Sequence, residues 1–183
     1  MKEKLDFKIT SNETLNDHTY LLKVIPANGE ALQELYPGQF VQILVQDSSA
    51  QFLRRPISIN YVDRKKNEMW LLVQRAGEGT KRITEMLVGE ELNLLFPLGN
   101  QFSMPKMGER VLLIGGGVGT APLLFLGKRL QESGFKPEFL LGGRSAKDIT
   151  QLDDFEMTGS VHVTTEDGSM GVKGVVTHHP VLE

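Results

Sequence analysis

Apolar residues alternate with polar residues along the first hundred positions, in short runs that turns separate. Leu5–Ile9 alternates strictly, which is typical of a strand with one buried face. Pro, Gly, Asn and Asp cluster between the runs, as they do in turns. The pattern predicts strands at residues 5–9, 20–25, 40–45, 57–62, 69–73 and 92–95. Six strands with one short helix over residues 80–87 indicate a small antiparallel barrel or sandwich.

The pattern changes near residue 104. Val111–Ile114 is uniformly apolar, as expected of a strand that is covered on both faces in a parallel sheet. Pro122 then opens a helical pattern that runs to Ser133, and Phe139–Leu141 and Val161–Thr164 are the next predicted strands. This order predicts an α/β domain over residues 104–183 that follows a β domain over residues 1–103.

Composition narrows the class of protein. The 183 residues suffice for one large domain or two small ones, and the net charge of −3 gives no reason to expect nucleic acid or an anionic membrane. No apolar run approaches the roughly 18 residues of a membrane span, and the first residues lack the apolar core of a signal peptide. We therefore expect a cytoplasmic protein. Cysteine is absent, which excludes disulfides and cysteine-ligated zinc or iron–sulfur sites within this chain.

A basic segment, Leu53-Arg54-Arg55-Pro56-Ile57-Ser58, enters one of the predicted strands. The arginine side chain offers a fork of donors that matches phosphate oxygens. Pro56 fixes the turn that aims Arg55, and the Ser58 hydroxyl is placed to meet a ring edge or a phosphate. The alternative is a surface basic pair at the start of a strand.

A second segment, Gly77-Glu78-Gly79-Thr80, follows the next predicted strand. Glycine lets the backbone approach a ligand closely, and a helix that starts near Thr80 aims free N–H groups at a phosphate. Alone it reads as a hairpin turn; with the arginine segment it favours a flavin dinucleotide site. The expected cofactor-binding residues are Arg55, Pro56, Ile57, Ser58, Gly79 and Thr80, with Leu72, Val73 and Gln74 beside the flavin, largely through their backbone.

A glycine cluster, Gly115-Gly116-Gly117-Val118-Gly119, lies between a predicted strand and a helix, where a nucleotide-binding loop is expected. Thr120 stands where the standard dinucleotide fingerprint has its third glycine, so a tight turn without a ligand is the alternative. Arg144 ends the next strand, where an arginine accommodates the 2′-phosphate of NADP; it is equally a candidate surface residue, and the choice between NAD and NADP stays open.

No catalytic group set is visible in the sequence. The four histidines have no partner at catalytic or metal-ligand spacing, and the segment Glu166-Asp167-Gly168 is either a substrate loop or an acidic turn. We predict neither a catalytic residue nor a metal ligand. This absence fits redox chemistry, in which the cofactor carries the reaction and the protein positions it.

The segments at residues 53–58, 77–80, 97–102 and 115–122 resemble the ferredoxin–NADP reductase superfamily, and within it the electron-transfer subunits of dihydroorotate dehydrogenase B. The similarity covers essentially the whole chain. It implies an antiparallel six-stranded FAD-binding β-barrel followed by an NAD-binding α/β domain. It also implies a role in pyrimidine biosynthesis. Electrons would pass from an FMN-containing dihydroorotate dehydrogenase catalytic subunit, through a [2Fe–2S] cluster, to FAD and then NAD⁺, within a heterotetramer.

The chain departs from this family at its end. The family continues with a Cys-Gly-Pro segment and four cluster-ligating cysteines, whereas this chain has no cysteine. We interpret it as a C-terminally truncated or naturally shortened form with a partial α/β domain that cannot hold the cluster. Two other functions stay open: the flavin subunit of an NADPH–ferredoxin oxidoreductase or sulfide dehydrogenase, and a non-catalytic FAD-binding module.

Overall fold

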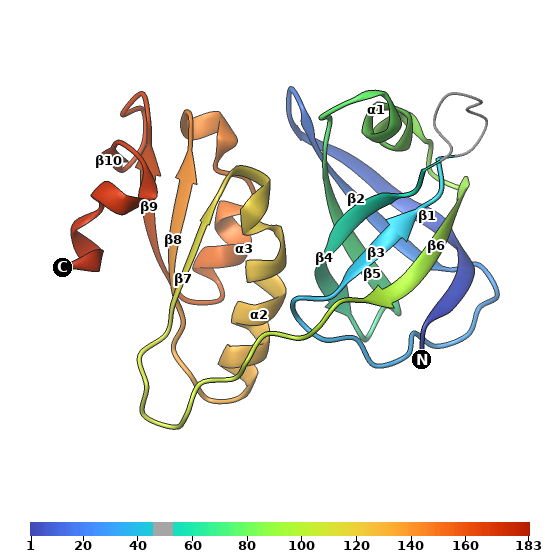
Figure 1. Cartoon of the computed structure of the whole chain (residues 1–183), viewed down its shortest axis with the longest axis horizontal. Helices are drawn as coiled ribbons and strands as arrows, with labels where there is room; N and C mark the ends of the chain where they lie inside the picture. Colours follow the sequence, from blue (N-terminus) through green and yellow to red (C-terminus); the bar gives the residue numbers. More distant parts are fainter. Residues whose placement is uncertain (46–52) are drawn as a thin grey trace. The chain divides into compact units, whose positions relative to one another are not determined.

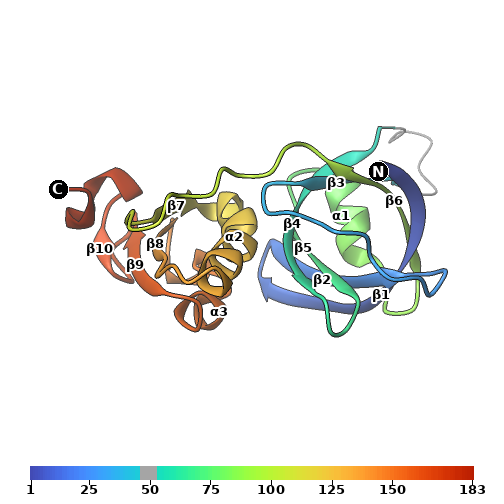
Figure 2. The same ribbon diagram turned by 90° about the horizontal axis from the view of Figure 1, so that it is seen from below.

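The computed structural model describes residues 1–45 and 53–183, which form two compact units, Met1–Phe102 and Ser103–Glu183. Strands wrap into a barrel in the first unit and lie in an open sheet in the second (Figures 1 and 2). Each unit has its own apolar core.

Six antiparallel strands close the barrel of the first unit in the order β1-β2-β5-β4-β3-β6. Inward side chains such as Phe7, Ile43 and Leu71 are fully buried, as the alternating pattern requires. The predicted six-stranded antiparallel barrel is therefore confirmed. The strands are β1 (Glu3–Asn16), β2 (Thr19–Pro26), β3 (Phe40–Ile43), β4 (Arg55–Asp63), β5 (Glu68–Gln74) and β6 (Glu91–Leu98).

Two strands run further than the sequence pattern indicates. Irregularities in register near Ser11 and Asn16 let β1 stay paired with β2 through a polar stretch that no alternation reveals. Strand β6 continues past the predicted residues 92–95 and includes Pro97 and Leu98, although proline favours turns. Leu98 pairs with Phe40, and the chain turns at Gly99, where φ is 80°.

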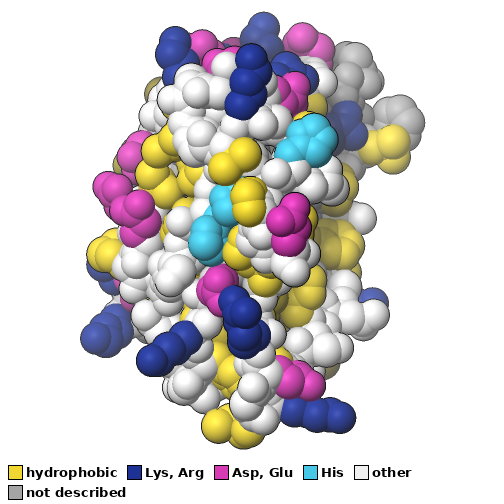
Figure 3. Space-filling model, turned by 90° about the vertical axis from the view of Figure 1, so that its left-hand side faces the viewer, with side chains coloured by type: hydrophobic (Ala, Val, Ile, Leu, Met, Phe, Trp, Pro, Cys, Tyr) yellow, Lys and Arg dark blue, Asp and Glu magenta, His cyan; other side chains and the backbone are white. Residues whose placement is uncertain are grey.

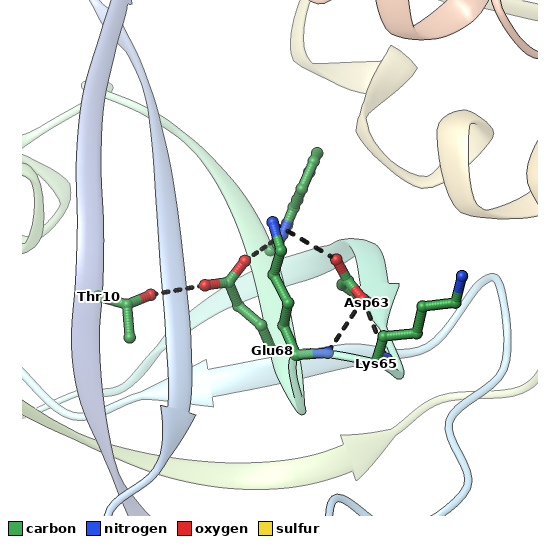
Figure 4. Close-up of polar contacts among 6 residues, drawn as sticks. Thr10, Asp63, Lys65 and Glu68 are labelled. Atoms are coloured by element: carbon green, nitrogen blue, oxygen red, sulfur yellow. Dashed lines mark hydrogen bonds and ion pairs between the residues drawn. The ribbon is translucent and has the colours of Figure 1, made fainter.

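Polar side chains hold the hairpin between β4 and β5, as Figure 4 shows. The Asp63 carboxylate accepts hydrogen bonds from the backbone N–H groups of Lys65 and Lys66 at 3.0 and 3.2 Å. Glu68 is buried and accepts from the Thr10 hydroxyl and from Trp70 Nε1, both at 2.8 Å. These bonds satisfy a buried carboxylate and join β1 to β5.

The second unit is a parallel sheet in the order β10-β9-β8-β7. Helices α2 and α3 cover one face, where Phe139 packs edge-on against Phe155 with ring centroids 4.9 Å apart. Residues 174–183 lie at the other face (Figures 1 and 2). This arrangement confirms the predicted parallel α/β unit. Its elements are β7 (Leu112–Gly116), α2 (Ala121–Glu132), β8 (Glu138–Gly143), α3 (Leu152–Glu156), β9 (Ser160–Thr165) and β10 (Val172–Lys173).

Within residues 1–45 and 53–183, no helix has both the length and the apolar character needed to cross a membrane.

Candidate functional site

The two segments that the sequence singled out in the barrel meet in space. Arg55 begins β4, and Gly79 lies in the first turn of α1 (Glu78–Glu85). A methyl group added at Gly79 would collide with Nε of Arg55 and lie 3.1 Å from its Cζ and Nη2. The guanidinium therefore rests against the helix start, where the N–H groups of the first turn have no acceptor within the helix. A cation and a helix N-terminus together form a site for an anion.

The neighbouring arginine has a structural role. Arg54 donates from Nη1 to the backbone carbonyls of Gln42 on β3 and Asn93 on β6, at 3.1 and 3.0 Å, and from Nη2 to the Asn93 side chain. Asn93 in turn donates to Asp6 on β1. Arg54 thus joins β3 to β6, whereas the guanidinium of Arg55 lies at the start of α1.

Thr80 shapes the loop before α1. Its hydroxyl accepts from the N–H groups of Ala76 and Gly77 at 2.9 and 3.2 Å and donates to the carbonyl of Gly77 at 3.0 Å. These bonds use the hydroxyl fully, so Thr80 presents its backbone N–H rather than its side chain to an anion. Glu78, exposed in the same turn, places a negative charge beside the site.

The hydrogen-bonded pairing between β4 and β5 ends near this site. Strands β4 and β5 pair only as far as Ile59 and Leu71. The start of β4 pairs instead with β3, where Ser58 lies opposite Phe40. Because side chains alternate along a strand, Arg55 and Ser58 lie on opposite faces of β4. A ligand that contacts both must pass the open edge of β4, which suits an extended dinucleotide better than a compact anion.

At the end of β5, fewer side chains are exposed to a ligand than the sequence predicts. Leu72 and Val73 are 2% and 0% exposed, whereas Gln74 is half-buried. Gln74 is therefore the residue of this segment within reach of a ligand on the surface. Pro56 is exposed, and Ile57 and Ser58 are half-buried on the facing strand.

The glycine cluster joins β7 to α2 through a single turn of 3₁₀ helix, Gly117–Thr120. Gly115 is needed for packing, because a methyl group there would lie 2.8 Å from Leu123 on α2, and Gly117 has a φ of 53°. Gly116, Val118 and Gly119 are exposed. Their backbone surrounds the N-terminus of α2, where a phosphate is favoured.

Arg144 is exposed at the end of β8, beside a loop that is bonded to the loop after β9. Ala146 donates to the Ser169 hydroxyl at 2.8 Å, and Asp167 donates from its backbone to the carbonyl of Arg144 at 3.1 Å. The Asp167 carboxylate accepts from the hydroxyl and the N–H of Ser169, and these bonds hold its pKa below the ordinary value. Asp167 therefore forms a turn.

Two histidines that are 17 positions apart meet across the fold. The rings of His162 and His179 lie 5.1 Å apart, and His162 Nε2 is 3.4 Å from Glu138, which also accepts from Arg110 at 2.8 Å. No pattern in the sequence indicates this cluster, because strand β9 and the C-terminal segment meet only in the tertiary fold. Among the described residues, no three His, Asp or Glu side chains are grouped closely enough to hold a metal ion.

Two proteins of similar sequence carry the same description, the electron transfer subunit of dihydroorotate dehydrogenase B (NAD(+)). The protein from Shouchella clausii is 42% identical over 152 residues, 81% of this chain and 59% of the relative. The one from Bacillus pumilus is 36% identical over 96% of this chain and 68% of the relative. The chain thus spans about six- to seven-tenths of the length of these relatives. No family model matches it.

Two solved structures superpose on more than nine-tenths of this chain. The NADH-dependent reduced ferredoxin–NADP oxidoreductase superposes with a TM-score of 0.82 at 28% identity, over 93% of this chain and 60% of the other. The FAD/NAD-binding domain of a Vibrio cholerae nitric oxide dioxygenase superposes with a TM-score of 0.79 at 19% identity, over 96% of this chain and 81% of the other. The second likeness bears on the fold alone.

Proposed function

The chain belongs to the family of dihydroorotate dehydrogenase B electron transfer subunits, and from this premise we propose that its barrel binds FAD and relays electrons between a partner protein and a nicotinamide dinucleotide. The observation that carries the proposal is the contact of Arg55 with the N-terminal turn of α1 at the open edge of β4. This contact places a cation suited to phosphate beside an unpaired strand edge along which an extended ligand can lie.

In this proposal, FAD supplies the redox chemistry and the chain supplies its position. Arg55 neutralises the pyrophosphate, and the backbone N–H groups of Gly79 and Thr80 add to that field. Pro56 and Ser58 meet the ring system on the other face of β4, Ile57 lies between them on the face of Arg55, and Gln74 lies at the facing edge. Leu72 and Val73, which are buried, keep that edge in place.

The second unit provides the nicotinamide dinucleotide site of the proposal. The exposed backbone from Gly116 to Gly119 and the start of α2 receive the pyrophosphate. Gly115 lets α2 pack closely on β7 and so fixes the loop. Arg144 lies at the end of the adjacent strand, where the ribose of the second nucleotide is expected.

The proposed partner is the dihydroorotate-oxidising, FMN-containing subunit, because the relatives are described as subunits of that enzyme. The route through a [2Fe–2S] cluster requires cysteine ligands that this chain does not contain. Electron entry into FAD therefore depends on groups outside the 183 residues, whereas FAD binding does not.

Anaerobic addition of NADH to the FAD-loaded chain tests the proposal. Loss of the oxidised flavin absorption supports an electron relay, and a faster reaction with NADH than with NADPH supports the NAD-linked assignment. Stable FAD binding with no reduction by either nucleotide would instead indicate a non-catalytic FAD-binding module.

A second candidate function is the flavin subunit of an NADPH–ferredoxin oxidoreductase. It is favoured by the structural likeness to a ferredoxin–NADP oxidoreductase and by the exposed cation Arg144. This candidate predicts faster flavin reduction by NADPH, and Arg144→Ala then removes that preference without changing FAD affinity.

A further inference from the structure

The two edges of the sheet in the second unit differ in how they are protected. Strand β10 forms one edge with only two residues, Val172 and Lys173, and the lysine is exposed. Short strands and lysines are features that keep a sheet edge from pairing with another chain. Strand β7 forms the other edge with five residues, Leu112–Gly116, and contains neither a charge nor a proline. The β7 edge therefore lacks the protection that the β10 edge has.

Every second residue of β7 directs its backbone groups away from the sheet. Among the described residues, β7 pairs with β8 alone. The N–H of Glu138 donates to the carbonyl of Val111 at 2.9 Å, so the backbone groups of residues 111, 113 and 115 face β8 in this parallel ladder. Those of residues 112, 114 and 116 face outward. They form a row of donors and acceptors that an added strand can pair with.

The side chains of β7 are typical of a strand inside a sheet. Residues 111–114 are uniformly apolar, as in strands that are covered on both faces. A methyl group at Gly115 would meet Leu123 on α2, so Ile114 points to the opposite face, where it is 44% exposed. Figure 3 shows the side of the second unit that carries residues 174–183, which lie on this face, with hydrophobic side chains at its surface. An exposed isoleucine on an uncharged edge indicates that a further strand covers it.

The β7 edge is complementary to a second copy of itself. Antiparallel pairing about a two-fold axis at Ile114 sets Ile114 opposite its own copy and Leu112 opposite the second copy's Gly116. A methyl group at Gly116 would have only the carbonyl oxygen of Gly142 within 4 Å, at 3.9 Å, so the leucine has room there. Like charges that face each other across strands repel, and residues 111–127 carry no charge. A self-paired β7 therefore meets neither a clash nor a repulsion at its axis.

We propose that β7 is a self-association site: two copies of this chain pair antiparallel through their β7 edges, with Ile114 on the two-fold axis. The two four-stranded sheets then join into one continuous sheet. Pairing satisfies the outward backbone groups of β7, and the two Ile114 side chains cover each other. The interface needs neither a flavin nor a nucleotide, so its test is independent of the proposed function.

Sedimentation equilibrium of the purified, cofactor-free chain tests the proposal. We expect a mass twice the 20.4 kDa of one chain. Ile114→Lys sets two lysines opposite each other and is expected to weaken self-association at least about 10-fold. An equimolar mixture of Ile114→Lys and Ile114→Glu is expected to associate again, because opposite charges then meet at the axis. Met157→Lys is the matched control: it adds the same charge at a side chain that is 65% exposed beyond α3, and it stays dimeric.

Ile114→Cys tests the register and keeps the strand uncharged. The chain has no cysteine, and paired residues of this kind have Cα atoms about 5.5 Å apart, within the range of a disulfide. Mild oxidation is expected to link two copies of Ile114→Cys but not of Met157→Cys.

Three results would overturn the inference. The first is a parent chain with the mass of one copy, and the second is a folded Ile114→Lys protein that associates like the parent. The third is a dimer whose Ile114→Cys variant does not cross-link, which would place the interface on another surface. The Ile114→Cys result stands even where Ile114→Lys fails to fold. Each of these results leaves the proposed function standing.

Discussion

At the scale of single residues, two adjacent arginines have different roles that their shared charge conceals. Arg54 donates hydrogen bonds to backbone carbonyl groups of β3 and β6, whereas Arg55 lies against the first turn of α1. Arg54 lies just before β4 and Arg55 is the first residue of that strand, and the two side chains make different contacts. Charge alone therefore singles out the segment, and the fold distinguishes Arg54, which bonds to the barrel, from Arg55, which we propose binds FAD.

Arg55→Ala is expected to weaken FAD binding by about 1.5–3 kcal/mol, the scale of a hydrogen bond to a charged group. Fluorescence titration with FAD measures this loss. Arg54→Ala provides the comparison: it lowers the free energy of unfolding by about 1–3 kcal/mol, because two strand carbonyls lose a donor. Unchanged FAD affinity in Arg55→Ala would remove Arg55 from the site.

Gly79→Ala separates ligand binding from helix stability. Alanine favours a helix over glycine by about 1 kcal/mol, yet the added methyl group collides with the guanidinium of Arg55. We expect FAD affinity to fall by about 1–3 kcal/mol through this displacement, with α1 retained in circular dichroism spectra. Gly77→Ala is the control, since nothing lies within 4 Å of that position and its φ of −177° suits any residue. An equal loss in both variants would contradict the displacement of Arg55.

At the scale of elements, side chains from distant strands hold helix α1 on the barrel and the C-terminal strap, residues 174–183, on the sheet. Asn12 on β1 donates to the carbonyls of Thr84 and Met86 at 3.0 and 2.7 Å, and so holds the C-terminus of α1 on the barrel. In the second unit, His179 joins the C-terminal strap to His162 on β9. Both elements therefore depend on contacts that lie far apart in sequence.

The strap is expected to loosen as the pH falls below neutrality. Partial burial, and then the charge of His162, lower the pKa of His179 below its ordinary value of 6.5. A group whose pKa is lower in the folded state is protonated first in the unfolded state, so its stabilisation is complete above pH 6.5 and is lost below it. The melting temperature of the second unit should fall between pH 7.5 and 5.5, by about a few degrees.

His179→Phe keeps a ring against His162 and removes the titration. Its melting temperature should change less over the same pH range. Glu138 adds a separate loss of stability at lower pH. Hydrogen bonds from Arg110 and then His162 hold the pKa of its carboxyl group below 4.5, and protonation weakens these bonds. An identical pH dependence in His179→Phe and the parent would assign the effect to other groups.

At the scale of the whole molecule, hydrophobic periodicity predicted both units because each strand and helix buries a regular face. The same reasoning predicted Arg55, Gly79 and the glycine cluster as site residues, since their chemistry is local, and that prediction awaits a binding measurement. It missed the end of β6, where pairing with β3 overrides the turn tendency of Pro97. It also missed the pair His162–His179 and the buried hydroxyl of Thr164, which depend on strand register rather than on neighbouring residues.

The most direct measurement is the uptake of FAD by the purified chain, followed by its absorption spectrum and by titration. The account predicts that one FAD binds per chain, with a perturbed flavin spectrum, and that Arg55→Ala binds it about 10- to 100-fold more weakly while keeping its fold. A folded chain that stays colourless after incubation with FAD would contradict the account at its centre.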